Sequence, residues 1–339
     1  MKSKFIKFIP VILCLVLFVA CKGNKKKTAD NDNPVFKSDS RLAEATDQIN
    51  NDPKNAKLYF HRGLMLEKMH QDTLALNDFK KAATFDSTNA EYVSAIGDLL
   101  FEHKDVTGSL VWIKKAIKLN PTDRKAHLKI AKLFMYINDY KEAFNEINIV
   151  LRGDVYDPEA YYLKGMVYKQ LKDTVKAISS FQTSLQVAPD FRDAVMQLGL
   201  LYSAKKDPLA LKYLDNAYRM DSTDVLPIFA KGVYYQNTND YATAKDYYKK
   251  CIIHDNQFVD AYFNMGYILL QQDSVEKAYR QYDLVTKIDP TNPAGYYNRG
   301  LCSEIMNKKK EAVDDYRQAL TLDSTYASPH DALKRLGIK

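Results

Sequence analysis

The chain has 339 residues, of which 46% are hydrophobic and 27% charged, and this composition excludes a disordered chain and a polytopic membrane protein. Four cysteines are too few for a disulfide-stapled scaffold, and six scattered histidines do not indicate a metal protein. The formal net charge of +7 is concentrated in the first 38 residues, and the +1 left for residues 39–339 excludes the basic surface that nucleic-acid binding requires.

The first twenty residues have the pattern of a secretory leader. Three of the first seven residues are lysines, and the stretch from Phe8 to Ala20 is nearly unbroken apolar sequence. This stretch is shorter than the roughly 20 residues that a membrane-spanning helix needs, so a spanning anchor is disfavoured. The small Ala20 directly before Cys21 resembles the lipobox of bacterial lipoproteins. The resemblance implies a lipoprotein signal peptide at 1–20 and acyl chains such as palmitate on Cys21, with an uncleaved or differently cleaved leader as the alternative.

Residues 21–38 are predicted to be a flexible tether that follows the lipidated cysteine. The run KGNKKKTADNDNP has no periodicity and no large apolar residue. In some bacterial groups, acidic residues after the lipidated cysteine direct export to the cell surface, whereas this segment begins with lysines that suit a headgroup surface. We therefore expect a lipid-anchored protein of a bacterial envelope membrane that faces the periplasm, with the outer membrane favoured over the inner.

From residue 56 onward the sequence repeats with a period of 34 residues. Seven of the twelve glycines share one phase, with Ala131 filling a gap between two of them. The glycines in this phase are Gly63, Gly97, Gly165, Gly199, Gly232, Gly266 and Gly300. Small residues and larger apolar residues follow each of them at fixed, helix-like intervals, which predicts two helices per period. Because glycine inside a helix costs about 1 kcal/mol relative to alanine, we expect each one where a second helix crosses closely and presents a small residue.

Polar residues mark the expected ends of these helices. Between the two helices of a repeat stands an aspartate that is expected to cap the second helix. These aspartates are Asp72, Asp105, Asp139, Asp173 and Asp240. Between repeats come turn-forming tetrapeptides such as DSTN at 86–89 and DPTN at 289–292.

The combined pattern resembles the tetratricopeptide repeat. In the fourth repeat the aromatic, glycine, tyrosine, alanine and phenylalanine positions of that family are Tyr161, Gly165, Tyr168, Ala177 and Phe181. The resemblance implies an all-α, right-handed superhelical solenoid of about eight helix–turn–helix repeats over 56–326. Residues 39–55 are expected to form an N-terminal half repeat, and 327–339 a C-terminal capping helix centred on Asp331 to Leu336. The repeats are 56–89, 90–123, 124–157, 158–191, 192–224, 225–258, 259–292 and 293–326.

The resemblance also implies a binding surface, because the first helices of such repeats line a concave groove. From the fourth repeat onward the fifth and ninth positions of each repeat are all apolar, and we predict that a protein or peptide partner of the envelope binds them. These residues are Tyr162, Met166, Met196, Leu200, Phe229, Val233, Phe263, Tyr267, Tyr297 and Leu301. The alternative is that superhelical curvature or the chain's own tail covers them. A two-carboxylate clamp is disfavoured, since Phe229 and Val233 replace the Lys and Asn that it needs.

Catalysis finds no support in the sequence. No phosphate-binding glycine loop, HExxH or GxSxG occurs, so we predict no catalytic residue, no metal site and no cofactor. Nothing requires Cys251 and Cys302 to pair. The predicted function is a membrane-anchored scaffold or adaptor for protein–protein interaction, and not an enzyme. A glycan- or peptidoglycan-binding module and a structural spacer without a specific ligand are the alternatives.

Overall fold

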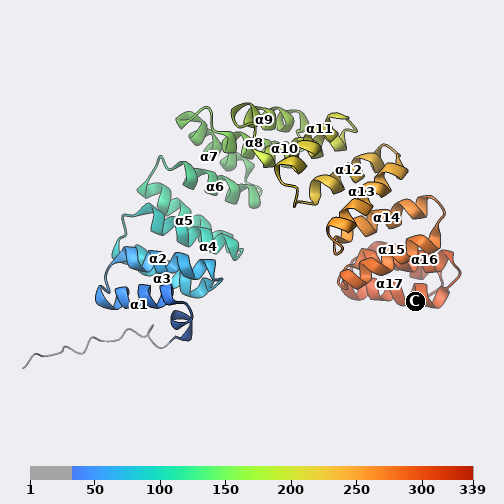
Figure 1. The fold of residues 1–339 in the computed structure, drawn as a ribbon, viewed down its shortest axis with the longest axis horizontal. Helices are drawn as coiled ribbons and strands as arrows, with labels where there is room; N and C mark the ends of the chain where they lie inside the picture. The colour runs from blue at the N-terminus through green and yellow to red at the C-terminus, as the bar shows by residue number, and fades with distance from the viewer. Residues whose placement is uncertain (1–32, 339) are drawn as a thin grey trace, which may run out of the picture. The chain divides into compact units, whose positions relative to one another are not determined.

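The computed structural model describes residues 33–338, so the predicted leader and Cys21 lie outside the described part of the chain. The described residues divide after Pro121 into two compact units, 33–121 (unit 1) and 122–338 (unit 2). Across both ranges the regular structure consists of eighteen α-helices and one 3₁₀ helix, with no strand (Figure 1). The predicted all-α class is therefore confirmed.

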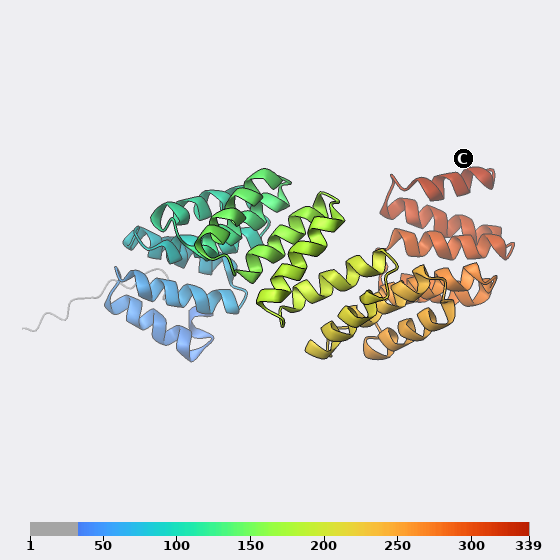
Figure 2. The same cartoon turned by 90° about the horizontal axis from the view of Figure 1, so that it is seen from above.

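Each unit is built from consecutive helix pairs whose two members pack against each other, as Figures 1 and 2 show. Unit 1 contains α1 (Ser40–Asn51), α2 (Ala56–Lys68), α3 (Asp72–Phe85), α4 (Ala90–Glu102) and α5 (Val106–Leu119). Unit 2 contains α6 (Arg124–Tyr136), α7 (Tyr140–Gly153), α8 (Pro158–Gln170), α9 (Thr174–Val187), α10 (Arg192–Ala204), α11 (Leu209–Met220), α12 (Leu226–Asn237), α13 (Tyr241–His254), α14 (Val259–Gln271), α15 (Val275–Ile288), α16 (Pro293–Ile305), α17 (Lys309–Leu322) and α18 (Ala327–Arg335). The pairs α2/α3 through α16/α17 are the eight predicted repeats, α1 is the half repeat and α18 is the capping helix. This last helix begins at Ala327, before the predicted Asp331.

The regular spacing of the glycines along the chain has a direct cause in the packing of each helix pair. A Cβ placed on Gly165 would lie 2.6 Å from the ring of Phe181, and one on Gly232 would lie 2.6 Å from the ring of Tyr248. Ordinary contacts between carbon atoms are about 3.5–4.0 Å, so no side chain fits there. The prediction of a close helix crossing is confirmed. Its detail is corrected: the glycine faces the large apolar residue of the second helix and not the small one.

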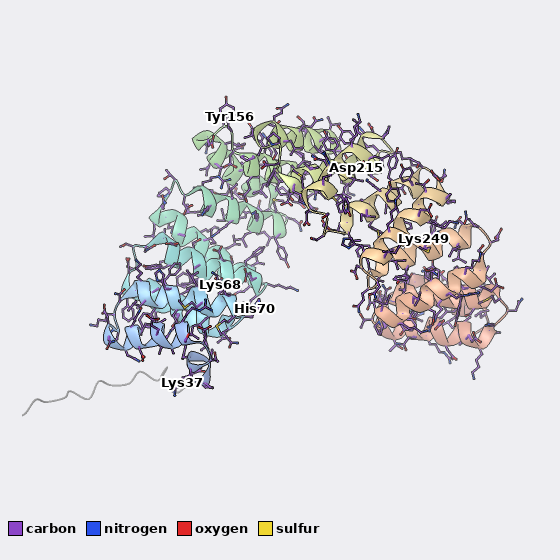
Figure 3. The ribbon with its side chains drawn as sticks, in the orientation of Figure 1. Lys37, Lys68, His70, Tyr156, Asp215 and Lys249 are labelled. Atoms are coloured by element: carbon purple, nitrogen blue, oxygen red, sulfur yellow. The ribbon has the colours of Figure 1, made fainter. Side chains whose placement is uncertain are left out.

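Between the two helices of each pair, the chain reverses through one residue in the left-handed conformation, and none of these residues is glycine. At the end of α4, Lys104 has φ 61° and its N–H bonds to the carbonyl of Phe101 at 2.8 Å, while the Asp105 N–H bonds to that of Leu100 at 2.9 Å. This pair of bonds satisfies carbonyls that the helix end leaves open. The full set is His70, Lys104, Asn138, Lys172, Lys206, Asn239, Asp273 and Asn307. Figure 3 labels His70.

Four of the five predicted aspartate caps are present. The Asp173 side chain accepts a hydrogen bond from the N–H of Lys176, and Asp105, Asp139 and Asp240 act in the same way on their helices. The prediction for Asp72 is wrong. This residue is the first of α3, one position beyond the cap, and its carboxylate instead lies 3.1 Å from His103.

The start of unit 1 is more ordered than the sequence predicted. Pro34–Lys37 form a 3₁₀ helix, and Phe36 is buried in the core of unit 1. The guanidinium of Arg62 lies 4.3 Å from the Phe36 ring centroid, a cation–π contact that holds this segment on α2. The predicted flexible tether therefore does not extend through residues 34–37.

Candidate functional site

The predicted groove residues lie on the first helices of five successive pairs in unit 2: α8, α10, α12, α14 and α16. Residues four positions apart share one face of a helix, so each helix presents its fifth- and ninth-position side chains together. We call this set the apolar stripe. Its members are Tyr162, Met166, Met196, Leu200, Phe229, Val233, Phe263, Tyr267, Tyr297 and Leu301.

The aromatic members at the fifth positions are half-buried, because each ring packs into its own pair. The Phe229 ring centroid lies 5.7 Å from that of Tyr248 on α13 and 5.2 Å from that of Phe258, which precedes α14. Tyr162 and Tyr297 make the same two kinds of contact with the residues at equivalent positions. Such ring pairs contribute about 0.5–1.5 kcal/mol beyond their burial. These side chains therefore stabilise the repeats, and only part of each ring reaches the surface.

Tyr267 differs from the rest of the apolar stripe. Its side chain on α14 is 43% exposed, whereas the other nine members are half-buried. A ninth-position tyrosine that presents an apolar ring and a hydroxyl to solvent is suited to an interface. Tyr267 is therefore the member of the stripe that a partner can reach with the least rearrangement.

Few charges accompany the apolar stripe. Asp193 and Asp260 are exposed near its edge, and burial together with the charge of Asp193 raises the pKa of Tyr162, which stays neutral at physiological pH. Glu304 accepts bidentate hydrogen bonds from Arg335 of α18 at 2.9 and 2.8 Å and one from the Tyr316 hydroxyl at 2.6 Å. Its carboxylate is thus occupied in holding the capping helix.

The cysteines of the described residues are buried and unpaired with each other. Burial raises the pKa of both Cys251 and Cys302 to about 12, so both stay protonated thiols. Within residues 33–338, no three His, Cys, Asp or Glu side chains are grouped to hold a metal ion. No helix in that range has the length and apolar character to cross a membrane.

Sequence reasoning missed two pockets in unit 2, because it considered only the groove-facing positions of the first helices. One, of 490 Å³, is lined in part by Tyr156 and Val155 in the loop between α7 and α8. Tyr156 is 72% exposed and points away from the helices (Figure 3). The other, of 410 Å³, lies among α11, α12 and α13. Two sequence signals could have indicated these pockets. Tyr156 is an aromatic residue where the other repeats have polar turn residues, and Lys231 occupies a position that is apolar in the neighbouring repeats.

Four of the eight described repeats, all in unit 2, match a known family. The tetratricopeptide repeat matches residues 158–191, 228–252, 259–292 and 293–326, in the same phase as the helix pairs. The chain therefore contains tetratricopeptide repeats, and this fold supports a scaffold for protein–protein interaction.

The chain is similar to curated proteins and to a solved tetratricopeptide repeat structure. The TPR repeat-containing protein MJ1428 of Methanocaldococcus jannaschii is 23% identical over 294 residues, which is 84% of this chain and 48% of that protein. The human protein O-mannosyl-transferase TMTC3 is 26% identical over 73% of this chain and 28% of its own length. This chain thus spans half or less of these two relatives. A tetratricopeptide repeat protein from Parabacteroides merdae superposes with a TM-score of 0.57 at 16% identity, over 72% of this chain and 97% of that one.

Proposed function

We propose that the protein is a membrane-anchored adaptor whose apolar stripe in unit 2 holds a segment of a partner protein. The observation that supports this is the unbroken apolar character of the fifth and ninth positions on five successive first helices, with Tyr267 exposed at 43%. An amphipathic helix or an extended apolar peptide has the chemistry to cover such a stripe.

The structure determines which residue tests this proposal. Phe229 and Phe263 pack against the rings of Tyr248 and Tyr282, so a charge at either position would disturb folding as well as binding. Tyr267 is exposed, and Tyr267→Asp places a charge in the stripe at low cost to stability. Tyr156→Asp is the matched control, since it changes the same residue type at an exposed site outside the stripe.

The experiment is crosslinking in cells followed by mass spectrometry of the proteins that co-purify. We expect one dominant partner that Tyr267→Asp loses and Tyr156→Asp keeps, with the same helix content and melting temperature in both variants. Retention of that partner by Tyr267→Asp would show that the stripe does not bind it. If purified cell-wall sacculi retain the protein in a Tyr267-dependent way and no protein partner appears, the site is a glycan site. If the protein binds neither a protein partner nor cell-wall sacculi, it is a structural spacer and the adaptor proposal is wrong.

We also propose that Cys21 carries the lipid that anchors the adaptor in a bacterial envelope, facing the periplasm. The support comes from the sequence: the apolar stretch from Phe8 to Ala20, and the small residue directly before the cysteine. Two or more acyl chains give stable anchoring, whereas one is marginal. Cells fed an alkyne-labelled palmitate should label the protein, and Cys21→Ser should abolish the label and release the protein from membranes. A Cys14→Ser control should leave both unchanged, and a labelled, membrane-bound Cys21→Ser protein would refute the anchor.

A further inference from the structure

The 410 Å³ pocket of unit 2 lies on the opposite face of α12 from the apolar stripe. On this helix the pocket is lined by Ile228 and Lys231, whereas Phe229 and Val233 belong to the stripe. In a helix with 3.6 residues per turn, Ile228 and Lys231 lie on one face, and Phe229 and Val233 lie on the opposite face. The pocket is therefore a separate site, closed on its sides by α11 and α13.

The base of the pocket is polar and largely fixed. Lys231 is only 9% exposed, its Nζ pairs with Asp215 of α11, and it lies 5.6 Å from the ring centroid of Tyr247. A buried ammonium group needs a carboxylate partner, so Asp215 neutralises the charge of Lys231. Burial and the nearby Asp215 raise the pKa of Tyr247, which keeps its hydroxyl neutral at pH 7. Figure 3 labels Asp215 on α11.

A second cation on the wall of the pocket has no such partner. Lys250 Nζ lies 4.5 Å from the centroid of the Tyr247 ring, and no carboxylate of residues 33–338 lies within ion-pair distance of it. His254, also on the wall, bonds through Nε2 to the carbonyl oxygen of Ser222 at 3.0 Å. Since Lys231 and Asp215 offset each other, the pocket has an excess positive charge from Lys250.

Next to this charge the wall is apolar. Ile253 of α13 lines the pocket and is 85% exposed, which is unusual for an isoleucine on a helix. Ile228 lines the opposite side and is half-buried. A ligand that buries an apolar group between the two isoleucines and places an anion near Lys250 satisfies both features of the site.

We propose that this pocket binds an acidic segment of a partner protein, which inserts one apolar side chain between Ile228 and Ile253 and places a carboxylate against Lys250. The charge complementarity selects an acidic partner. The position behind α12 allows it to bind while the apolar stripe is occupied.

Peptide titration followed by methyl NMR of the isoleucines tests this assignment. The probes are acetyl-Glu-Glu-X-Glu-Glu-amide, with X as Phe, Leu or Trp, and the matching peptides with Gln in place of Glu. We expect at least one acidic peptide to shift the Ile228 and Ile253 methyl signals in a saturable way, and its Gln counterpart to bind roughly fivefold more weakly or worse. Equal binding of the Glu and Gln peptides, or no shift with any acidic peptide at millimolar concentration, would overturn the proposal.

Neighbouring lysines on α13 provide a matched pair of variants. Lys250→Glu should weaken the acidic peptide by roughly fivefold or more, while Lys249→Glu, which alters an exposed lysine outside the pocket, should change it little. Both side chains are exposed, so neither change should alter the helix content. An equal loss of peptide affinity in both variants would mean that the peptide responds to the general surface charge and not to the pocket, which would overturn the proposal. Tyr267→Asp should leave the pocket signals unchanged, which separates this site from the adaptor surface proposed above.

Discussion

Replacing Gly232 with alanine tests the close helix crossing that sets the period of the sequence. The new Cβ would lie 2.6 Å from Cε1 and 2.8 Å from Cδ1 of Tyr248, so the ring must move by about 1 Å to reach a normal contact. The ring has little room to move. It is fully buried, and its hydroxyl bonds to Gln236 at 2.7 Å and to the amide of Asn264 at 3.3 Å.

Two opposing terms give the expected size of the effect. Alanine is favoured over glycine inside a helix by about 1 kcal/mol, while overpacking a close-packed core costs about 1–3 kcal/mol. Because the displaced ring also holds two hydrogen bonds, we expect the upper part of that range. Gly232→Ala should therefore lower the free energy of unfolding by about 1–2 kcal/mol.

Gly153 provides the control, since a Cβ there would meet no atom within 4 Å. It is exposed at the last position of α7, and Gly153→Ala should be neutral or stabilising by up to about 0.5 kcal/mol. The assay is urea denaturation followed by circular dichroism, with hydrogen exchange to locate the loss in α12 and α13. A Gly232→Ala protein as stable as wild type would refute the argument that the crossing excludes a side chain.

Three further predictions concern buried or paired groups. Arg62→Met removes the guanidinium that pairs with the buried carboxylate of Asp78 on α3, and this loss of a buried ion pair should cost unit 1 about 3–5 kcal/mol in urea denaturation followed by the single tryptophan, which lies in that unit. The Arg335 guanidinium and the Tyr316 hydroxyl lower the pKa of Glu304, so its contribution to stability is present at neutral pH and is lost as the pH falls through the folded-state pKa. Glu304→Gln should therefore weaken the protein by about 0.5–1 kcal/mol at pH 7, and by less at pH 3, in thermal melts; an equal deficit at both values would contradict this. With pKa values raised to about 12 by burial, Cys251 and Cys302 should resist a thiol reagent at pH 8 in the native protein and react in guanidinium, and rapid native labelling would contradict their burial.

The sequence predicted the repeat architecture well because the constraint is local and recurs eight times. A very small residue is needed where the two helices of a pair cross, glycine in seven repeats and Ala131 in the third, so these positions set the period without knowledge of the partner helix. The turn residues could not be predicted in this way. Lys104 and Asn138 both adopt φ of 61°, although glycine would cost least there. Asparagine tolerates this left-handed conformation, but lysine does not favour it, so the backbone hydrogen bonds and the packing of the two helices must hold Lys104 in place.

The exposure of the candidate site could not be predicted from the sequence either. Position five of a repeat is apolar in both a bound groove and a packed interior, and the pattern does not separate the two. The structure shows that the Phe229 ring is shared between packing and surface, because Phe258 two helices later in the chain reaches back to it. Among the aromatic members of the apolar stripe, Tyr267 differs from Tyr162, Phe229, Phe263 and Tyr297, which each pack against another ring, and it is 43% exposed.

A comparison of equivalent positions shows why a pocket opens beside α12. The seventh position of a repeat is a cation in four repeats, at Arg62, Lys164, Lys231 and Arg299. Both arginines bond to an aspartate sixteen residues later, Asp78 or Asp315. In the sixth repeat that aspartate is replaced by Tyr247, whose ring stacks with Tyr235 instead of neutralising the cation. Lys231 therefore pairs with Asp215, sixteen residues earlier. The Asp215 side chain is 60% exposed. The sixth repeat thus lacks the aspartate that follows the cation by sixteen residues in the first and eighth repeats. Lys250, Ile228 and Ile253 border the pocket beside Tyr247, and this arrangement is expected of a site where an acidic ligand supplies the missing negative charge.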